Sequence, residues 1–286
     1  MNNITRKVFD TIYHVFDELK LNNFVTLGRH EEPIWDRPLI GVAAGDDPYY
    51  EFLKEHIGAF HWSPAEAFAL KYGTDSRVST GNLRVLSMVF PQTKATKDMQ
   101  NKATVFPCDN WVVSRGEWEP LMREFAPKLE NALEDLGCRT ASIDLRKEFS
   151  RHESEKQGIA SSWSHRHSAF AAGLGTFGLS DGFISEKGIA IRITSAIIEA
   201  DLDVTDRGDR GPYDWCLYHK DGSCGACINR CPVDSISKEG HDKNICSAYE
   251  DEACLKYWPK HIERGDYIFG CGLCQVKVPC RDNRPL

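Results

Sequence analysis

The sequence lacks the features that mark membrane, secreted and low-complexity proteins. Among its 286 residues, no run approaches the ~18 apolar residues that a membrane-spanning helix needs. Residues 1–20 are polar and charged, without the apolar core of a secretory signal and without a twin-arginine pair. There is no low-complexity tract, and the only internal similarity is between two groups of cysteines. We therefore expect a cytoplasmic protein of one or two domains with no membrane partner.

Positive charge is also in short supply. The chain has 35 Lys and Arg residues against 42 Asp and Glu residues, which gives a net charge of −7 and a pI near 5.8. Such a chain does not offer the broad basic face that binds the phosphates of nucleic acids, so we do not expect nucleic acid as a partner. Hydrophobic residues make up 41% of the sequence, which is enough for a substantial core.

What the sequence does have is cysteine, concentrated at one end. Nine of the eleven cysteines lie within residues 216–286. Two groups stand out, Cys224-Gly-Ala-Cys227-Ile-Asn-Arg-Cys231-Pro232 and Cys271-Gly-Leu-Cys274-Gln-Val-Lys-Val-Pro-Cys280. Short C-x-x-C turns and a Cys-Pro step are typical of domains with two 4Fe–4S clusters, where that cysteine ligates the other cluster. The pattern predicts two such clusters and, with them, the transfer of single electrons.

Two other interpretations of these cysteines are weaker. A disulfide framework needs an oxidising compartment, which the absence of a secretory signal does not support. Structural zinc is the stronger rival, because C-x-x-C pairs also bind zinc. The Cys231-Pro232 step and the number of cysteines fit two cubic clusters better than two tetrahedral zinc sites.

The spacing also divides the ligands between the clusters. The usual motif has a cysteine three positions before Cys224, where this chain has Asp221, so Cys216 must take its place across a short loop. The first cluster is then assigned to Cys216, Cys224, Cys227 and Cys280. The second is assigned to Cys231, Cys246, Cys271 and Cys274, with Cys254 as the alternative to Cys246. Cys108 and Cys138 lie outside this region and are expected to be buried apolar residues.

The preceding 205 residues are predicted to form an α/β domain that binds a cofactor or substrate, followed by a small ferredoxin-like domain over residues 206–286. Periodicity and capping signals predict helices over 3–20, from Pro48 toward Gly58, over 64–72, 117–136 and 165–172. Apolar runs predict strands over 39–44, 84–90, 138–145 and 189–198. Residues 146–160 are interpreted as a charged surface segment, and 201–215 as the linker.

A glycine motif lies close to a pair of histidines. Gly173-Leu174-Gly175-Thr-Phe-Gly178 has the spacing of a dinucleotide site, but a helix precedes it and turn residues follow. We interpret it as a close-packed loop that could still approach a large flat ligand. His165 and His167 could donate a proton beside this loop, or be satisfied structural histidines. Arg192 is expected to be a paired arginine at the edge of the core rather than a ligand anchor.

Several of these segments together resemble a known family. They are Val85 to Pro91, Val113-Ser-Arg115-Gly116, Ala171 to Gly178, Gly188 to Ile198, and Tyr267-Ile-Phe-Gly-Cys271-Gly-Leu-Cys274-Gln275. Over residues 80–280 the chain resembles epoxyqueuosine reductase and, more distantly, the reductive dehalogenases. The resemblance implies a nitroreductase-like α/β domain that cradles a base-off cobalamin, and two 4Fe–4S clusters that deliver electrons to it. It also implies that Gly173, Leu174, Gly175 and Gly178 lie near the corrinoid, and that Cys246 rather than Cys254 is a ligand.

The chain departs from this family in three places. Asp221 and Lys277 stand where the family has cysteines, and the last group ends instead at Cys280. The family's acidic proton donor would fall near Ile159, so Asp144 is the nearest comparable acid. The family's RNA-binding helical repeats would follow the clusters, and six residues remain after Cys280. We therefore expect an oxidoreductase that receives electrons from a low-potential donor and passes them to a corrinoid or small-molecule acceptor. A non-catalytic carrier or activator of a separate corrinoid protein is the alternative. Epoxyqueuosine reduction in tRNA is expected to be inefficient.

Overall fold

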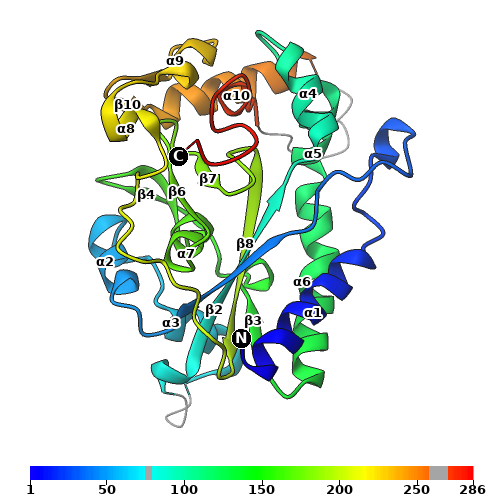
Figure 1. Cartoon of the computed structure of the whole chain (residues 1–286), viewed down its shortest axis with the longest axis vertical. Coiled ribbons are helices and arrows are strands. Elements are labelled where there is room, and N and C mark those ends of the chain that lie inside the picture. Colours follow the sequence, from blue (N-terminus) through cyan, green and yellow to red (C-terminus); the bar gives the residue numbers. More distant parts are fainter. Residues whose placement is uncertain (75–78, 258–269, 286) are drawn as a thin grey trace.

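The computed structural model describes residues 1–74, 79–257 and 270–285, and the side chains of 254–257 lie outside the described part. At its centre is an antiparallel sheet of four strands in the order β1-β2-β8-β3 (Figure 1). These strands are β1 (Leu39–Ala44), β2 (Leu83–Pro91), β8 (Ile191–Glu199) and β3 (Arg139–Ser142). Three small hairpins are added: β4 (Arg151–Ser154) with β5 (Gly158–Ser161), β6 (Gly175–Phe177) with β7 (Phe183–Ser185), and β9 (Ile236–Ser237) with β10 (Gly240–His241).

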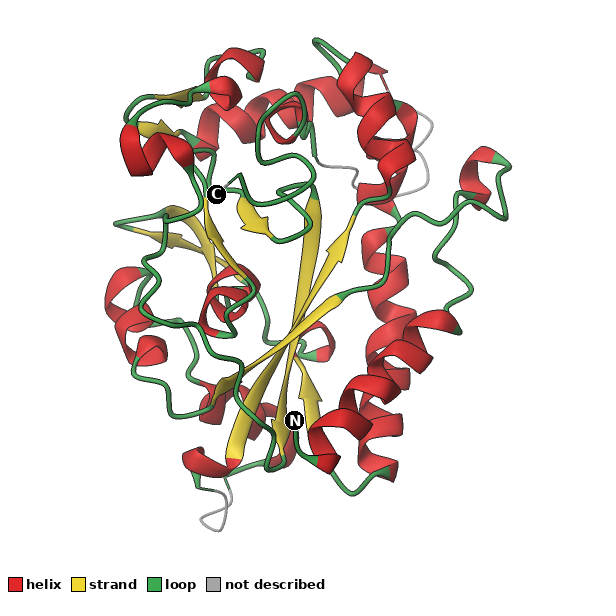
Figure 2. Ribbon diagram, in the orientation of Figure 1, coloured by secondary structure: helices red, strands yellow, loops and turns green. Residues whose placement is uncertain are grey.

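Helices cover both faces of the sheet, as Figure 2 shows. The described helices are α1 (Asn3–Asp17), α2 (Tyr49–His56), α3 (Pro64–Tyr72), α4 (Lys94–Lys102), α5 (Asp109–Gly116), α6 (Trp118–Asp135), α7 (His165–Ala171), α8 (Leu217–Asp221), α9 (Ala226–Arg230) and α10 (Lys243–Tyr257). Short 3-10 turns occur at Val25–Leu27, Thr80–Asn82, Ile143–Leu145 and Leu273–Gln275. None of the described helices is long and apolar enough to cross a membrane.

The sheet is buried on both faces because its strands alternate between two apolar cores. Val42, Leu86 and Ile198 point into the core beneath α1 and α6. Their neighbours Ala43, Val85 and Ile197 point into the opposite core, beneath α2, α3 and α7. Period-2 alternation with apolar residues on both sides is what a central strand between two helical layers requires. The first part of the chain is therefore a three-layer arrangement of mixed α and β structure.

The cysteine-rich region lies across one end of the sheet, where β2 ends and β8 begins (Figure 1). Helices α8, α9 and α10 and the C-terminal loop gather there. The backbone N–H of Ile189 donates to the carbonyl of Cys280 at 2.8 Å, which ties the C-terminal loop to the segment before β8. The mixed α/β prediction and the cysteine-rich C-terminal region are confirmed.

The sequence located most central elements but missed several small ones. The capping box before α3 is present, with Glu66 N–H 3.3 Å from Ser63 Oγ and Ser63 N–H 2.7 Å from the Glu66 carboxylate. The predicted strand over 138–145 stops at Ser142 and turns into a 3-10 helix. The surface segment 146–160 contains part of the β4–β5 hairpin, whose first strand, Arg-His-Glu-Ser, is polar throughout and whose second has only Ile159 and Ala160 as adjacent apolar residues.

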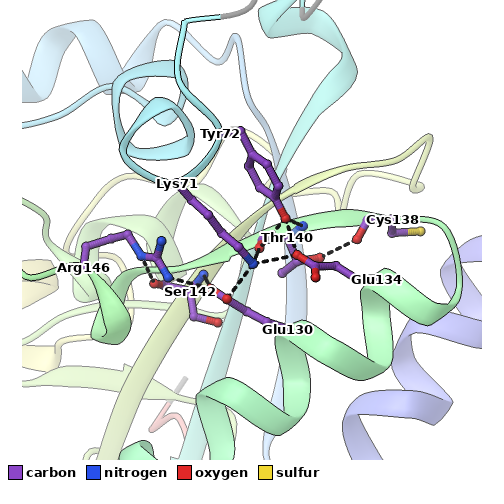
Figure 3. Close-up of polar contacts among 8 residues, drawn as sticks. All are labelled: Lys71, Tyr72, Glu130, Glu134, Cys138, Thr140, Ser142 and Arg146. Atoms are coloured by element: carbon purple, nitrogen blue, oxygen red, sulfur yellow. Dashed lines mark hydrogen bonds and ion pairs between the residues drawn. The ribbon is translucent and has the colours of Figure 1, made fainter.

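A network of charged side chains closes the free edge of β3 (Figure 3). Lys71 on α3 contacts Glu130 and Glu134 on α6 at 2.6 Å and donates to the Thr140 carbonyl at 2.8 Å. The Ser142 N–H donates to Glu130, and Arg146 donates to both Glu130 and the Ser142 carbonyl. These side chains satisfy backbone groups that an edge strand would otherwise leave unpaired, and they join helices from opposite faces of the sheet.

We predict that Lys71→Met destabilises the protein by about 2 kcal/mol, because it leaves Glu130 and the Thr140 carbonyl with fewer partners in a largely buried site. The hydrogen bond from Lys71, and then that from Tyr72, lowers the pKa of Glu134. That contribution is present above the unfolded-state pKa of about 4.5 and is lost as the pH falls through the lower folded-state pKa. Urea unfolding followed by tryptophan fluorescence should show the difference narrowing below pH ~4.5. Lys94→Met, which removes an exposed pair with Asp98, should cost under about 0.5 kcal/mol, and an equal loss in both variants would contradict the prediction.

Candidate functional site

Four cysteines, which we call the first cysteine set, surround a small apolar cavity. They are Cys216, Cys224, Cys227 and Cys280. Cys216 lies at the start of α8, Cys224 and Cys227 lie at α9, and Cys280 comes from the C-terminal loop. The cavity has a volume of about 30 Å³, and Leu179, Ile184 and Trp215 are among the residues that line it. Segments far apart in the sequence therefore bring four thiols to one place.

Four further cysteines, the second cysteine set, surround a separate cavity of about 220 Å³. They are Cys231, Cys246, Cys271 and Cys274. The Ser235 N–H donates to the Cys231 sulfur at 3.2 Å, and the Ser235 hydroxyl lies 3.1 Å from the same atom. Arg230 holds the turn around Cys274 by donating to the Leu273 and Val276 carbonyls at 3.2 Å. This cavity also has charged residues in its wall, unlike the first one.

Burial disfavours ionisation of several thiols in both sets. None of the eight is in a disulfide. Burial, and then the neighbouring cysteines of the same set, raises the pKa of Cys227 to about 11 and that of Cys280 to about 12. Burial likewise raises the pKa of Cys271 to about 12. Such thiols ionise readily only when a metal centre replaces the proton. Two separate groups of four sulfur donors fit the ligand chemistry of two 4Fe–4S clusters.

The described residues contain no three His, Cys, Asp or Glu side chains placed to ligate a single metal ion. The structure divides the eight cysteines in the way that the spacing predicts, although their role as ligands stays a prediction. Cys254, the alternative to Cys246, and the motif residues Tyr267 to Phe269 fall outside the part of the chain whose side chains are described. Cys138 is buried and Cys108 is partly buried, and both lie outside the two sets.

A third and larger cavity, which we call the large cavity, lies between the end of the sheet and the cysteine-rich region. Its volume is about 510 Å³, which is in the range of small-molecule sites. Aromatic side chains form part of its wall, including Trp111, Trp118 and Trp163. It shares five lining residues with the cavity of the second cysteine set: Arg166, Gly182, Glu250, Gly272 and Gln275. Among the described residues it shares Ile189 with the cavity of the first set, and no cysteine of either set lines it directly.

Gly272 lies in the wall shared by the large cavity and the cavity of the second cysteine set. It lies between Cys271 and Cys274 with φ +59°, and a Cβ at this position would lie 2.0 Å from the Trp111 indole. Only glycine fits both that backbone conformation and that contact. The Gln100 amide also donates to the Cys271 carbonyl at 2.8 Å, so the sheet-bearing part of the chain fixes this turn from two sides.

His165 and Asp144 form a partly buried pair at the wall of the large cavity. His165 Nε2 lies 3.9 Å from Asp144 Oδ1, and Asp144 also accepts a hydrogen bond from the Thr194 hydroxyl. His165 Nδ1 lies 2.8 Å from Ser195 Oγ, which also accepts a bond of 2.8 Å from the Trp163 indole. The Trp163 indole can only donate, so Ser195 Oγ accepts that bond and can either donate to or accept from His165 Nδ1, according to the tautomer of the imidazole.

That Nε2 is buried and has no hydrogen-bond partner in the described part of the chain. Burial lowers the pKa of His165, and the charge of Asp144 opposes the shift. The lowered pKa favours the neutral imidazole at pH 7, and its Nε2 faces Asp144 without a hydrogen bond among the described residues. This is an arrangement that can hold or move a proton at the cavity wall.

His167 lies elsewhere. Its Nδ1 is 2.7 Å from Ser164 Oγ, and its ring faces a separate aromatic pocket of about 330 Å³. Burial, followed by the charge of Arg166, lowers its pKa well below the usual value. The structure thus brings His165, and not His167, to the large cavity.

The glycine segment is built into the fold rather than into the large cavity. Gly175 begins β6, and a Cβ there would lie 2.0 Å from the Ile184 carbonyl of the paired strand. Leu174 packs against the apolar cores of the sheet, and the Gly173 carbonyl accepts from Arg210 at 3.2 Å. Gly178 lines the cavity of the first cysteine set. None of the four lines the large cavity, so their contact with a cofactor stays a prediction.

Arg192 is not the paired arginine at the edge of the core that the sequence analysis predicts. It lines the large cavity, and no hydrogen bond or ion pair is found for its guanidinium among the described residues. Burial, and then the nearby charge of Arg115, lowers its pKa to about 9. No sequence signal indicates this, because a single arginine in an apolar strand is compatible with either role.

The chain is similar to known proteins in its fold and in part of its sequence. No family model matches the chain. A structure of epoxyqueuosine reductase with an epoxyqueuosine-modified tRNA stem loop matches 98% of this chain and 66% of that one, with a TM-score of 0.51 and 15% identity. The chain has the epoxyqueuosine reductase fold.

A curated epoxyqueuosine reductase from Leadbetterella byssophila is 30% identical over 110 residues, which are 38% of this chain and 34% of that protein. This match indicates that the chain is a distant homologue of epoxyqueuosine reductase. The matched segment spans about a third of the curated relative. A catabolic reductive dehalogenase structure aligns with a TM-score of 0.46 and 15% identity, over 74% of this chain and 27% of that one. The predicted resemblance to epoxyqueuosine reductase is confirmed at the level of fold and distant homology.

Proposed function

We propose that this protein is an iron–sulfur oxidoreductase that passes single electrons to an acceptor in the large cavity. The cysteine-rich region, residues 206–286, would be a ferredoxin-like domain in which each cysteine set holds one 4Fe–4S cluster. Residues 1–205 would be the nitroreductase-like domain that holds the acceptor. The observation that supports this most is the gathering of eight thiols into two groups of four, with the second group against the large cavity.

The positions of the two cysteine sets suggest an order of electron transfer. The second set shares five lining residues with the large cavity, so its cluster would be the one that reduces the acceptor. The first set would receive electrons from a low-potential donor protein or small reductant. The clusters supply single electrons at low potential, and the chain supplies burial, position and a proton. Of the two histidines, His165 would hold the proton, together with Asp144.

A corrinoid is one candidate for the acceptor, and a small molecule is the other. The large cavity has the volume of a site for a drug-sized ligand, whereas a cobalamin with its side chains is much larger. The cavity as it stands would enclose only part of a corrinoid, so we assign no step to one. If the acceptor belonged to a separate corrinoid protein, this chain would instead be an electron carrier or reductive activator.

Epoxyqueuosine reduction in tRNA is a second candidate, which the shared fold favours. The sequence argues against this activity, because the family's acidic proton donor would fall near Ile159 and the nearest comparable acid is Asp144. In the structure Asp144 nevertheless lines the large cavity beside His165, so a proton source is available there. The acidic overall charge remains unfavourable for contacts with tRNA phosphates.

Anaerobic purification followed by metal analysis tests the proposal. We expect about eight irons per chain from two clusters of four, with the broad visible absorbance of 4Fe–4S centres. Cobalt that remains bound would support a corrinoid enzyme. Turnover with a low-potential reductant should then be compared between an epoxyqueuosine-containing tRNA stem loop and small electrophiles, with and without cobalamin. Zinc in place of iron, or iron-loaded protein that reduces none of these acceptors, would contradict an iron–sulfur oxidoreductase.

A further inference from the structure

The large cavity holds a guanidinium, that of Arg192, which makes no ion pair or hydrogen bond within the described part of the chain. Four arginines line it, together with three acids, which leaves one positive charge in excess. The arginines are Arg115, Arg151, Arg166 and Arg192, and the acids are Glu119, Asp144 and Glu250.

The three acids are occupied by other groups. Glu119 pairs with Arg115 at 3.4 Å, and Glu250 accepts from the Cys271 backbone N–H at 3.0 Å. Asp144 accepts from the Thr194 hydroxyl and faces His165. Arg192 is consequently left without an ion pair or hydrogen bond among the described residues.

This arrangement is costly for the protein alone. Arg192 is partly buried, and burial, followed by the charge of Arg115, disfavours its charged form, while the charges of Glu250 and Glu119 oppose this shift without cancelling it. The side chain still carries its charge at neutral pH, because its pKa of about 9 lies above 7. An oxyanion between these groups would remove both penalties, since a guanidinium binds a carboxylate or phosphate through two parallel hydrogen bonds.

We propose that Arg192, assisted by the charge of Arg115, anchors an oxyanion of the molecule that occupies the large cavity. The ligand would be a carboxylate or a phosphate ester whose remaining part is flat and apolar enough to lie against Trp111, Trp118 and Phe149. The proposal rests on the proposed function only in identifying this ligand with the electron acceptor or its cofactor. Binding of the anion itself requires no electron transfer.

Binding measurements on the anaerobically purified full-length protein test the anchor. Isothermal titration calorimetry would compare naphthalene-2-carboxylate with its neutral amide, naphthalene-2-carboxamide, and with inorganic phosphate. Arg192→Gln should weaken binding of the carboxylate at least about tenfold and leave the amide within about twofold. Arg192→Lys should recover part of the affinity. Arg151→Gln removes the same charge from an exposed position in the wall and should change the carboxylate affinity less than about twofold.

The source of the oxyanion is distinguished by adding corrinoids. Cobalamin carries a nucleotide phosphate that cobinamide lacks. If Arg192→Gln weakens the binding of cobalamin but not that of cobinamide, the anchor holds the phosphate of the cofactor. An effect on the carboxylate would assign it to an acidic substrate. Equal loss for carboxylate and amide, no loss in any arm, or no wild-type binding of the carboxylate, phosphate and cobalamin would overturn the proposal. If the purified protein holds no iron and reduces no acceptor but still binds the anion through Arg192, the proposed function fails and the anion anchor stands.

Discussion

Replacing Cys216 with serine should lower the iron content of the anaerobically purified protein from about eight to about four atoms per chain. Cys216 is the least conventional ligand assignment, because the usual motif has its cysteine at the position of Asp221. In the structure Cys216 nonetheless lies at the start of α8, within the cavity that holds Cys224, Cys227 and Cys280. A cubic cluster needs four ligands, and the apolar wall of this cavity offers no described replacement.

The measurement is iron analysis together with the absorbance of reduced and oxidised protein. Cys138→Ser is the matched control, since Cys138 is also buried but packs in the apolar core beneath α1 and α6. It should keep about eight irons. Cys254→Ser should also keep both clusters, because the spacing and the resemblance assign the ligand role to Cys246. Full iron in Cys216→Ser, or loss of half the iron in Cys254→Ser, would show that the ligand assignment is wrong.

The cysteine sets and the central strands could be predicted because their signals are local. Spacing within the C-x-x-C turns and the Cys231-Pro232 step indicates two groups of thiols, and the family resemblance selects Cys246 over Cys254. The Ser63 to Glu66 capping box fixes the start of α3 within four residues of sequence. Signals of this kind are independent of how the rest of the chain packs.

The large cavity could not be predicted because its wall is assembled from distant segments. Asp144 and His165 meet only because β3 and β8 pair, so that the turn after Ser142 lies beside Thr194 and Ser195. The β4–β5 hairpin separates Asp144 from the glycine segment along the chain, so spacing alone puts the acid too far away. Arg192 is recognisable as unpaired among the described residues only once the partners of Glu119 and Glu250 are known.

The glycine segment has a structural role that its spacing does not indicate. Its spacing suggests contact with a large ligand, whereas Gly175 is required by the approach of the Ile184 carbonyl. A Gly175→Val substitution would therefore disturb the β6–β7 pairing directly. Loss of cofactor binding in such a variant would not distinguish contact from misfolding, and for this reason variants of the cavity wall are the better probes.

The second large effect is expected at Asp144. Asp144→Asn should lower turnover with the acceptor that the wild-type protein reduces by about 100-fold, which is the usual contribution of a positioned proton donor or acceptor. The carboxylate lies 3.9 Å from the unpaired Nε2 of His165 and is the charge that raises the pKa of that imidazole against burial. Asp17→Asn, which removes an exposed partner of Arg37, should leave turnover within about twofold.

The pH dependence separates a proton-transfer role from a structural one. The pKa of His165 is lowered from 6.5, so the protonated imidazole that pairs with Asp144 forms only below that pH. If this pair delivers the proton, wild-type turnover should rise as the pH falls below 6.5, and Asp144→Asn should abolish the rise over that range. Because the folded-state pKa is depressed, His165 also costs stability as the pH falls below 6.5, so thermal melts must confirm folded protein at each pH. A parallel rise in both proteins would assign Asp144 to positioning alone, and unchanged turnover in Asp144→Asn would remove the pair from the reaction.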